Sequence, residues 1–531
     1  MFNSVNNFDF KINKNSIYSI FFKMFIGFVF SVFFFNILIF NINLFFLFIL
    51  PIIGSIIVAF IPSANKNLIK EIGLFLSASV FLYSLLLWIN FDNSVCKFQY
   101  YENIKYLYPW DSESYTPIIL GVDGISLFFI LLTTLLIFLC ILASWSNIHS
   151  HFKEYIICLL VLESLLLGVF MTLDLLIFYV LFESTLIPMY IMILIWGSRE
   201  RKVRAATMLF IYTLFGSIFM LAGIVYIYWV YNSTDYNILL SSVNFSFFEQ
   251  KLLWLAFFLS FATKVPMLPV HIWLPEAHVE APTSGSVILA GILLKLGIYG
   301  FLRFSLPLFG EANFYFAPLV YTISVLGVIY TSLTAIRQTD LKRIIAYTSV
   351  AHMNIVMIGL YSFNTIGLSG SILQSVSHGF VSSALFLIIG VVYDRFHTRI
   401  IKYYSGLVHI MPLYSIIFLF FTMANIALPG TSSFVGEFLI LVGSFRENTT
   451  VTFLGATGMI LGGAYSLWLY NRIVYGNLKK DENYVNLKYS YDINRREFFV
   501  FIPLILGTVI LGIYPNILLQ SLDASLLNLL F

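Results

Sequence analysis

Four charged residues, Glu183, Lys264, Lys295 and Glu437, each stand inside a long apolar run of the sequence. An ionisable side chain in such a run costs on the order of 3 kcal/mol or more, so it needs a partner or a chemical task. Carboxylates and lysines whose protonation states depend on one another can pass protons between them. The pattern predicts proton transfer, with hydrogen-bonded contacts between helices as the structural alternative.

Two of the apolar runs contain helix-breaking residues. Lys264 comes two residues before Pro266, and Pro269 follows three residues later. In the second run, ALPGTSSFVGEF, the break is at Pro429 and Gly430. Proline removes a backbone donor and interrupts a helix, which frees carbonyl groups inside the apolar segment. We therefore expect two broken helices, and a lysine at such a break is a candidate proton-binding group.

Three histidines and a fourth carboxylate lie in neighbouring runs. His271 follows Lys264 by seven residues, and His352 and His378 lie in SVAHMNIVM and SVSHGFVSSALFL. Imidazole titrates near neutral pH, so each can relay protons, although a hydrogen-bonded core histidine is the alternative for each one taken singly. Glu163 is isolated in IICLLVLESLLLGVF. We treat it as a possible secondary site.

The composition excludes an ordinary water-soluble protein. Of 531 residues, 60% are apolar and 10% are charged, against roughly 25% charged in an average soluble domain. The three cysteines form no CxxC pair and no cluster with histidine, which argues against an iron-sulfur centre or a metal site. The sequence has no P-loop and no GxGxxG motif after a strand. We expect no cofactor in this chain and no nucleic-acid partner.

The apolar runs are long enough for an all-α, multi-pass membrane protein. A further Phe-rich run at 18–41 is a possible extra span. The fourteen predicted spans cover residues 43–62, 72–91, 118–144, 155–173, 175–197, 206–230, 252–274, 281–305, 316–336, 343–361, 366–393, 409–444, 452–474 and 498–520.

The two breaks fall in spans seven and twelve, five spans apart. Discontinuous helices at matching positions of two inverted repeats mark the ion path in several transporter folds. We therefore expect two inverted five-helix repeats. The predicted parts are an N-terminal extension at 1–42, spans one to three at 43–154, the repeats at 155–305 and 306–476, and a loop with the last span at 477–531.

Basic residues are distributed unevenly over the predicted loops. Nineteen of the 29 Lys and Arg residues fall in loops after odd-numbered spans, among them 337–343. Short loops on the cytoplasmic or matrix side collect positive charge. The loops at 92–117 and 231–250 are then on the opposite side, together with Arg303 at a span end. His278 is expected in a loop.

The N-terminal region suggests a gene carried by an organelle. It has lysines but no arginine up to residue 40, so an amphipathic, Arg-rich transit peptide is absent. The bias toward Phe, Ile and Asn is also what an AT-rich gene would encode.

Several stretches resemble the antiporter-like membrane subunits of the proton-pumping NADH:ubiquinone oxidoreductase, respiratory complex I, and in particular its chain 4 group. The resemblance extends over about residues 43–520. The stretches are LGVDGISLFF (120–129), LFESTLIPMYIMILIWGSRERK (181–202), TKVPMLPVHIWLPEAHVEAPTSGSVILAGILLKLGIYGFLRF (263–304), TDLKRIIAYTSVAHMN (339–354) and LPGTSSFVGEF (428–438).

The resemblance implies roles for the four isolated charges. Glu183 would pair with Lys264, Lys295 would be the central relay reached through the histidines, and Glu437 would form the exit. It also implies partners: other complex I subunits, especially neighbouring antiporter-like chains, with membrane lipids around them. FMN, iron-sulfur clusters and ubiquinone would belong to those partners, and the location would be the mitochondrial inner membrane.

Three alternatives remain open at this point. The chain could be a Na⁺/H⁺ antiporter subunit or the membrane subunit of an energy-converting hydrogenase, because both share buried charges and broken helices. It could also be a structural scaffold whose charges hold helices together.

Overall fold

The computed structural model describes residues 43–104, 118–148, 150–242, 245–477 and 491–530. The chain divides into two units, Met1–Leu44 and Phe45–Phe531. The expected extension at 1–42, with its possible span at 18–41, lies outside the described residues, as do residues 105–117 of the 92–117 loop and residues 478–490. The fold described below is that of the second unit.

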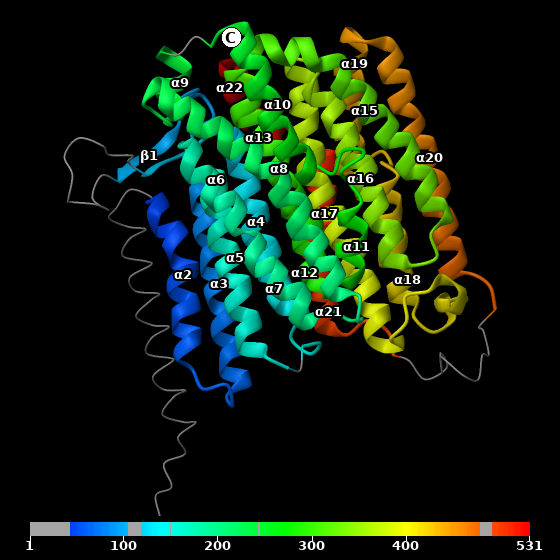
Figure 1. The fold of residues 1–531 in the computed structure, drawn as a ribbon. Coiled ribbons are helices and arrows are strands. Elements are labelled where there is room, and N and C mark those ends of the chain that lie inside the picture. The colour runs from blue at the N-terminus through cyan, green and yellow to red at the C-terminus, as the bar shows by residue number, and fades with distance from the viewer. Residues whose placement is uncertain (1–42, 105–117, 149, 243–244, 478–490, 531) are drawn as a thin grey trace, which may run out of the picture. The chain divides into compact units, whose positions relative to one another are not determined.

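The described part of this unit is built mainly of helices (Figure 1). Between Thr283 and Leu308 the helix continues through two π-helical turns, named η1 and η2. The helices are α2 (Leu44–Phe60), α3 (Lys66–Ile89), α4 (Gly124–Ala143), α5 (Phe152–Met171), α6 (Leu175–Ser184), α7 (Leu186–Trp196), α8 (Lys202–Tyr231), α9 (Tyr236–Ser242), α10 (Phe247–Lys264), α11 (Trp273–Glu280), α12 (Thr283–Ile288), η1 (Leu289–Leu293), α13 (Leu294–Gly300), η2 (Phe301–Ser305), α14 (Leu306–Leu308), α15 (Gly310–Arg337), α16 (Leu341–Leu360), α17 (Thr365–Phe396), α18 (Pro412–Asn425), α19 (Ser432–Glu447), α20 (Thr449–Val474), α21 (Arg495–Ile513) and α22 (Asn516–Leu530), with short 3-10 turns at Ile401–Tyr403 and Leu407–His409.

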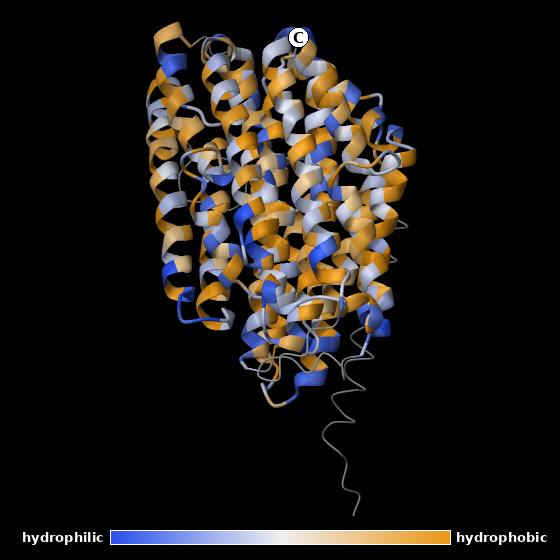
Figure 2. Cartoon of the chain, turned by 90° about the vertical axis from the view of Figure 1, so that its right-hand side faces the viewer, coloured by the Kyte–Doolittle hydropathy of each residue, from blue (hydrophilic) through white to orange (hydrophobic). Residues whose placement is uncertain are grey.

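The multi-pass helical membrane fold predicted from the sequence is confirmed. In the described residues, eleven helical segments are long and apolar enough to cross a membrane, and α2 and α18 are shorter apolar helices. The number of fourteen spans stays a prediction. The helices are apolar along most of their length, with hydrophilic residues at their ends and also at mid-height within the bundle (Figure 2).

Two elements differ from the expected all-α pattern. Residues 118–144 were expected to form one span, but Ile118–Val122 is strand β2, which pairs antiparallel with β1 (Gln99–Ile104). Helix α4 begins after Asp123, whose carboxylate accepts from the backbone N–H of Ser126 and caps it. The predicted span at 498–520 is likewise divided between α21 and α22.

The helices differ in how much of their surface other helices cover. The central stretches of α17 and of the segment from Thr283 to Leu308 are buried on all sides. Helix α8 instead leaves Ile211, Phe215 and Ile218 more than half exposed. Their spacing of four and three residues places them on one helix face, which suits contact with lipid. Lys295 is carried by the segment from Thr283 to Leu308, and Glu437 is packed against α17.

Both expected helix breaks are present. Helix α10 ends at Lys264, and the chain becomes helical again only at Trp273, where α11 begins. The indole Nε1 of Trp273 donates to the carbonyl oxygen of Thr263 at 2.9 Å, so a carbonyl at the broken end has a donor. The second break separates the end of α18 at Asn425 from the start of α19 at Ser432.

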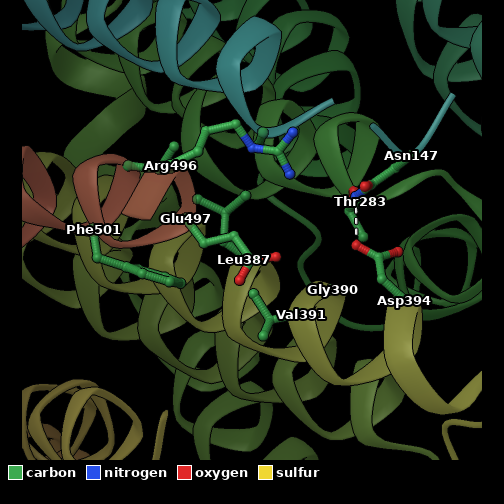
Figure 3. Close-up of a pocket in the computed structure, with 11 residues that line it drawn as sticks. Asn147, Thr283, Leu387, Gly390, Val391, Asp394, Arg496, Glu497 and Phe501 are labelled. Carbon is green, nitrogen blue, oxygen red and sulfur yellow. Dashed lines mark hydrogen bonds between the residues drawn. The ribbon is translucent and has the colours of Figure 1, made fainter. Parts of the chain in front are cut away.

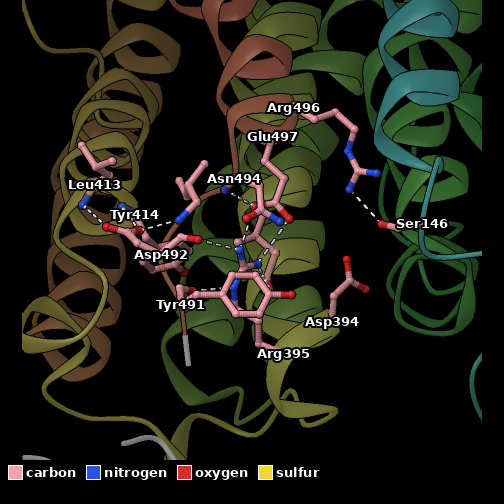
Figure 4. A network of polar contacts seen from close by, with 12 residues as sticks. Ser146, Asp394, Arg395, Leu413, Tyr414, Tyr491, Asp492, Asn494, Arg496 and Glu497 are labelled. Carbon is pink, nitrogen blue, oxygen red and sulfur yellow. Dashed lines mark hydrogen bonds and ion pairs between the residues drawn. The ribbon is translucent and has the colours of Figure 1, made fainter. Parts of the chain in front are cut away.

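A polar network joins the helix ends where the basic loops gather (Figure 4). Arg395 near the end of α17 forms an ion pair with Glu497 of α21 at 2.8 Å and donates to two carbonyls of residues 491–492. Asp492 accepts from the backbone N–H of Leu413 at 2.8 Å. Arg496 donates to Ser146, which follows α4. These contacts tie α17, α18, α21 and the end of α4 together at one level.

Candidate functional site

The first pair of charges lies between α6 and α10. Lys264 is 2% exposed, and its Nζ lies 4.4 Å from the centroid of the Phe182 ring, next to Glu183 in the chain. The ammonium and the Glu183 carboxylate are within electrostatic range. Neither the Lys264 nitrogen nor the two Glu183 oxygens have a hydrogen-bond partner among the described residues. This pair therefore interacts through space rather than by direct contact.

Glu183 sits at an interruption that the sequence explains. Helix α6 ends at Ser184 and α7 begins at Leu186. Pro188 follows in the first turn of α7, and it has no N–H to donate to the carbonyl of Ser184 four residues earlier. The helix assignment of the predicted single span at 175–197 is thus interrupted at Thr185, so both groups of this pair lie next to discontinuities in their helices.

Close packing connects this pair to the next lysine. A Cβ atom at Gly297 would lie 2.6 Å from Val265 Cγ2, 2.9 Å from the Phe261 carbonyl oxygen and 3.2 Å from Lys264 Cβ. Only glycine lets α13 approach the end of α10 this closely. Lys295 is two residues away on α13, so the two lysines lie on helices in direct contact.

Lys295 is fully buried between the two π-helical turns. Its Nζ donates to the carbonyl oxygen of Ala290 in η1 at 2.6 Å and lies 2.9 Å from Nδ1 of His378 on α17. Single π-helical turns inside α-helices occur often at functional sites. They have no signal in this run of Leu, Ile and Gly, and the sequence analysis missed them.

From Lys295 a row of side chains in contact runs to Glu437. The rings of His378 and His352 have centroids 5.7 Å apart, and His352 Nδ1 lies 2.9 Å from Glu437 Oε1. Gln374 also donates to this oxygen at 3.0 Å. All four titratable members are at most 6% exposed. We refer to Lys295, His378, His352 and Glu437 as the contact row.

Two of the predicted residues lie apart from this row. His271, in the break after α10, has its ring near Tyr330 and Tyr347, with centroids 6.4 Å away in each case. Glu163 on α5 is fully buried, and its two carboxylate oxygens have no hydrogen-bond partner in the part of the chain that the structure describes. Neither side chain makes a polar contact with the contact row there.

Two buried residues were missed because they lie near span ends. His278, expected in a loop, is fully buried in α11 with its ring stacked on Phe386 at 4.7 Å. Lys342, counted in the 337–343 loop, is fully buried in α16 and donates to Ser286 Oγ and to the Ala281 carbonyl. His278 is within electrostatic range of both Lys342 and Lys295. His278 and Lys342 extend the polar interior beyond the predicted residues.

A small cavity lies at the end of this extension (Figure 3). It is lined by Thr283 at the start of α12 and by Asp394 of α17, whose carboxylate accepts from the Asn147 side chain. Asp394 is within electrostatic range of Lys342. Glu497 of the polar network described above also lines the cavity. Titratable groups are therefore present from the basic helix ends inward to Lys295.

The arrangement suits proton movement. Lysine, histidine and carboxylate side chains follow one another along it, and groups this close influence one another electrostatically. Among the described residues, no group of three or more His, Cys, Asp or Glu side chains is arranged to hold a metal ion.

Comparison with known proteins places this arrangement in a family. The family description "NADH:quinone oxidoreductase/Mrp antiporter, TM" matches residues 172–462. An NADH-ubiquinone oxidoreductase chain 4 from Arabidopsis thaliana is 59% identical over 479 residues, which cover 90% of this chain and 95% of the relative. The chain belongs to the NADH:quinone oxidoreductase/Mrp antiporter family. The matched range includes Glu183, Lys264 and the whole contact row.

Solved structures in this family share the fold. A chain of respiratory complex I from Thermus thermophilus with bound NADH superposes with a TM-score of 0.81 at 26% identity, covering 92% of this chain and 100% of that one. A chain of the Mrp complex from Dietzia sp. DQ12-45-1b gives a TM-score of 0.80 at 19% identity, covering 92% and 96%. The second likeness concerns the fold alone, so it does not favour antiporter activity.

Proposed function

We propose that this chain is the chain 4 membrane-arm subunit of a mitochondrial NADH:ubiquinone oxidoreductase. It moves protons across the inner membrane, while partner subunits oxidise NADH and reduce ubiquinone. The high identity to a chain 4 relative over nine-tenths of the chain supports this assembly. The observation that carries the proton-transfer role is the contact row, which joins a buried lysine to a buried glutamate through two imidazoles.

Each member of the contact row has a role that follows from its contacts. Lys295 Nζ lies within hydrogen-bond distance of His378 Nδ1, so a proton can pass between them without backbone movement. The Nδ1 atom of His352 lies within hydrogen-bond distance of the Glu437 carboxylate, and the His352 ring lies beside that of His378. Gln374 holds the Glu437 carboxylate in place from the other side. Glu437 is then the terminal proton acceptor of the row.

The first pair controls entry to this row electrostatically. The negative charge of Glu183 favours the ammonium form of Lys264, and a change in either charge alters the energy of a proton on the other. Because Gly297 brings α13 against the end of α10, the charge on Lys264 also acts on Lys295. His271 is a further possible relay at the break, and Glu163 a secondary one. Proton movement along the contact row is thereby linked to the state of the first pair.

The remaining predictions concern the wider assembly. FMN, iron-sulfur clusters and ubiquinone belong to partner subunits in this proposal, and neighbouring antiporter-like chains and lipids contact this one. The boundaries of the two inverted repeats at 155–305 and 306–476 stay predictions. The eleven membrane-length helices in the described residues are consistent with an inner-membrane location.

The test is Lys264→Ala in the intact complex, reconstituted into vesicles. The proposal predicts loss of NADH oxidation that is coupled to a proton gradient, and near-normal rates with a full gradient would overturn it. Lys153→Ala is the matched control, because Lys153 lies near a helix end and its Nζ donates to the exposed Ala59 carbonyl, away from the first pair and the contact row. Sodium-dependent exchange without NADH would instead identify an antiporter, and co-purifying nickel a hydrogenase.

A further inference from the structure

A second polar ladder leads away from Lys295 on the same helix face. Tyr299 and Arg303 follow Lys295 at intervals of four residues, and positions four apart share a face of a helix. Arg303 lies in η2, where its Nε donates to the Tyr299 hydroxyl at 3.2 Å. Its Nη2 forms an ion pair with Asp123 at 2.6 Å. The sequence analysis placed Arg303 among the charges at span ends, and its side chain is 4% exposed.

This ladder ends at a cavity on the side opposite the basic loops. Asp123 and Arg303 line a cavity of about 430 Å³ together with Lys97, Asn237 and Asn528. Lys97 and Asn237 belong to the two loops that the charge distribution assigns to that side. Arg303 is therefore the side chain that separates the cavity on that face from Tyr299.

The hydrogen-bond chemistry of the ladder does not conduct protons. A guanidinium has only donors and cannot be deprotonated in a protein, so it cannot accept a proton from Asp123 and release one to Tyr299. The Tyr299 hydroxyl accepts from Arg303 and donates its single hydrogen to the Phe170 carbonyl at 3.0 Å. That carbonyl does not pass a proton on toward Lys295. The link between the cavity and Lys295 is thus blocked at Arg303, because the guanidinium exchanges no proton, and the Tyr299 hydroxyl is turned toward the Phe170 carbonyl.

We propose that Asp123, Arg303 and Tyr299 form a proton-tight seal between Lys295 and the cavity. This inference rests on the proposed function of Lys295 as a proton relay. The three residues act as positioning and insulating groups. They hold the end of α13 and prevent protons on the side opposite the basic loops from returning to Lys295. The fixed positive charge of an arginine also makes an electrostatic barrier to protons in other membrane pores.

The ladder is also held firmly in place, as a seal requires. Asp123 is fixed as the cap of α4, and a Cβ at the following Gly124 would lie on the carbonyl oxygen of Ser521 in α22. The guanidinium carbon lies 4.9 Å from the ring centroid of Phe98 and 5.8 Å from that of Tyr236. The two rings and Asp123 hold the guanidinium in place at the cavity wall, and Tyr299 beyond it is fully buried.

The decisive experiment compares Arg303→His with Arg303→Gln in the whole complex in vesicles. Histidine accepts a proton on one nitrogen and releases one from the other, whereas glutamine does neither at neutral pH. Passive proton permeability is measured without NADH, from the relaxation of an internal pH dye after a pH jump. We expect Arg303→His to raise permeability by at least about threefold near the ordinary imidazole pKa, with Arg303→Gln close to wild type.

Two results would overturn the seal. One is wild-type permeability in Arg303→His, and the other is an equal leak in both variants, which would show that packing and not donor chemistry matters. If neither variant assembles, Tyr299→Phe decides, because it keeps the Arg303–Asp123 ion pair. Its permeability should equal that of the wild type, and a severalfold leak would contradict the proposal. Because no NADH is used, these outcomes are independent of the Lys264→Ala test of the proposed function.

Discussion

The two halves of the predicted proton path are built differently. Glu183 and Lys264 face each other at helix interruptions without a direct hydrogen bond in the described structure. Lys295 and Glu437 are instead joined through two histidines by contacts of hydrogen-bond length at each end. The first half can therefore respond to charge alone, whereas the second half depends on exact contact distances. Substitutions of the same kind should have different effects in the two halves.

The largest effect is expected at the junction of the two halves. Lys295→Met keeps the size of the side chain but removes the group that contacts His378 and the Ala290 carbonyl. Removing a group that takes part in proton transfer typically lowers a rate by about a hundredfold or more. The NADH-driven proton gradient of the reconstituted complex should fall accordingly. If the gradient of Lys295→Met stays within a few-fold of wild type, Lys295 is not part of the proton relay.

The sharpest comparison shortens one carboxylate in each half by a methylene group. Glu437→Asp draws the carboxylate away from His352 and Gln374, and hydrogen bonds to charged groups contribute about 1.5–3 kcal/mol, so we expect about tenfold slower pumping. Glu183→Asp loses no hydrogen bond seen among the described residues and should change pumping by less than about twofold. Equal losses in initial pumping rate would show that the two halves work alike.

The contact between the halves can be tested by stability. Gly297→Ala places a methyl group against Val265 and the Phe261 carbonyl, and such overpacking typically costs about 1–3 kcal/mol. The temperature at which the complex loses activity should fall by a few degrees. Gly310→Ala is the control, since its Cβ would meet no atom within 4 Å in the described structure.

The smallest effect is expected at Glu163. Its carboxylate has no polar contact with the contact row in the described residues, so the relay has no link through it. Glu163→Gln keeps the size of the side chain and should leave the pumping rate within about twofold of wild type. A tenfold loss would show that a third carboxylate belongs to the path.

Much of the candidate site could be predicted because an ionisable residue inside an apolar run is visible in the sequence. Glu183, Lys264, Lys295 and Glu437 were identified in this way, and prolines predicted both helix breaks. Lys342 and Arg303 were missed because charges near span ends look the same whether they face water or lie buried.

Other features have no signature in one sequence. The π-helical turns around Lys295 arise from packing between enclosed helices, and Gln374 is an uncharged residue among many. The strand pair at 99–122 was missed because β2, in Ile118–Val122, is as apolar as the helix that follows it. Tertiary contacts decide such features, and local composition does not.

The indole of Trp273 gives the first helix break a further meaning. By donating to the Thr263 carbonyl, it satisfies a backbone group at the interruption, so this geometry is a resting state of the polypeptide. The gap beside Lys264 is therefore present before any proton arrives. No segment of helix has to unwind before Lys264 takes up or releases a proton. The rate of that step is therefore set by the arrival and departure of charge, on the time scale of side-chain motion.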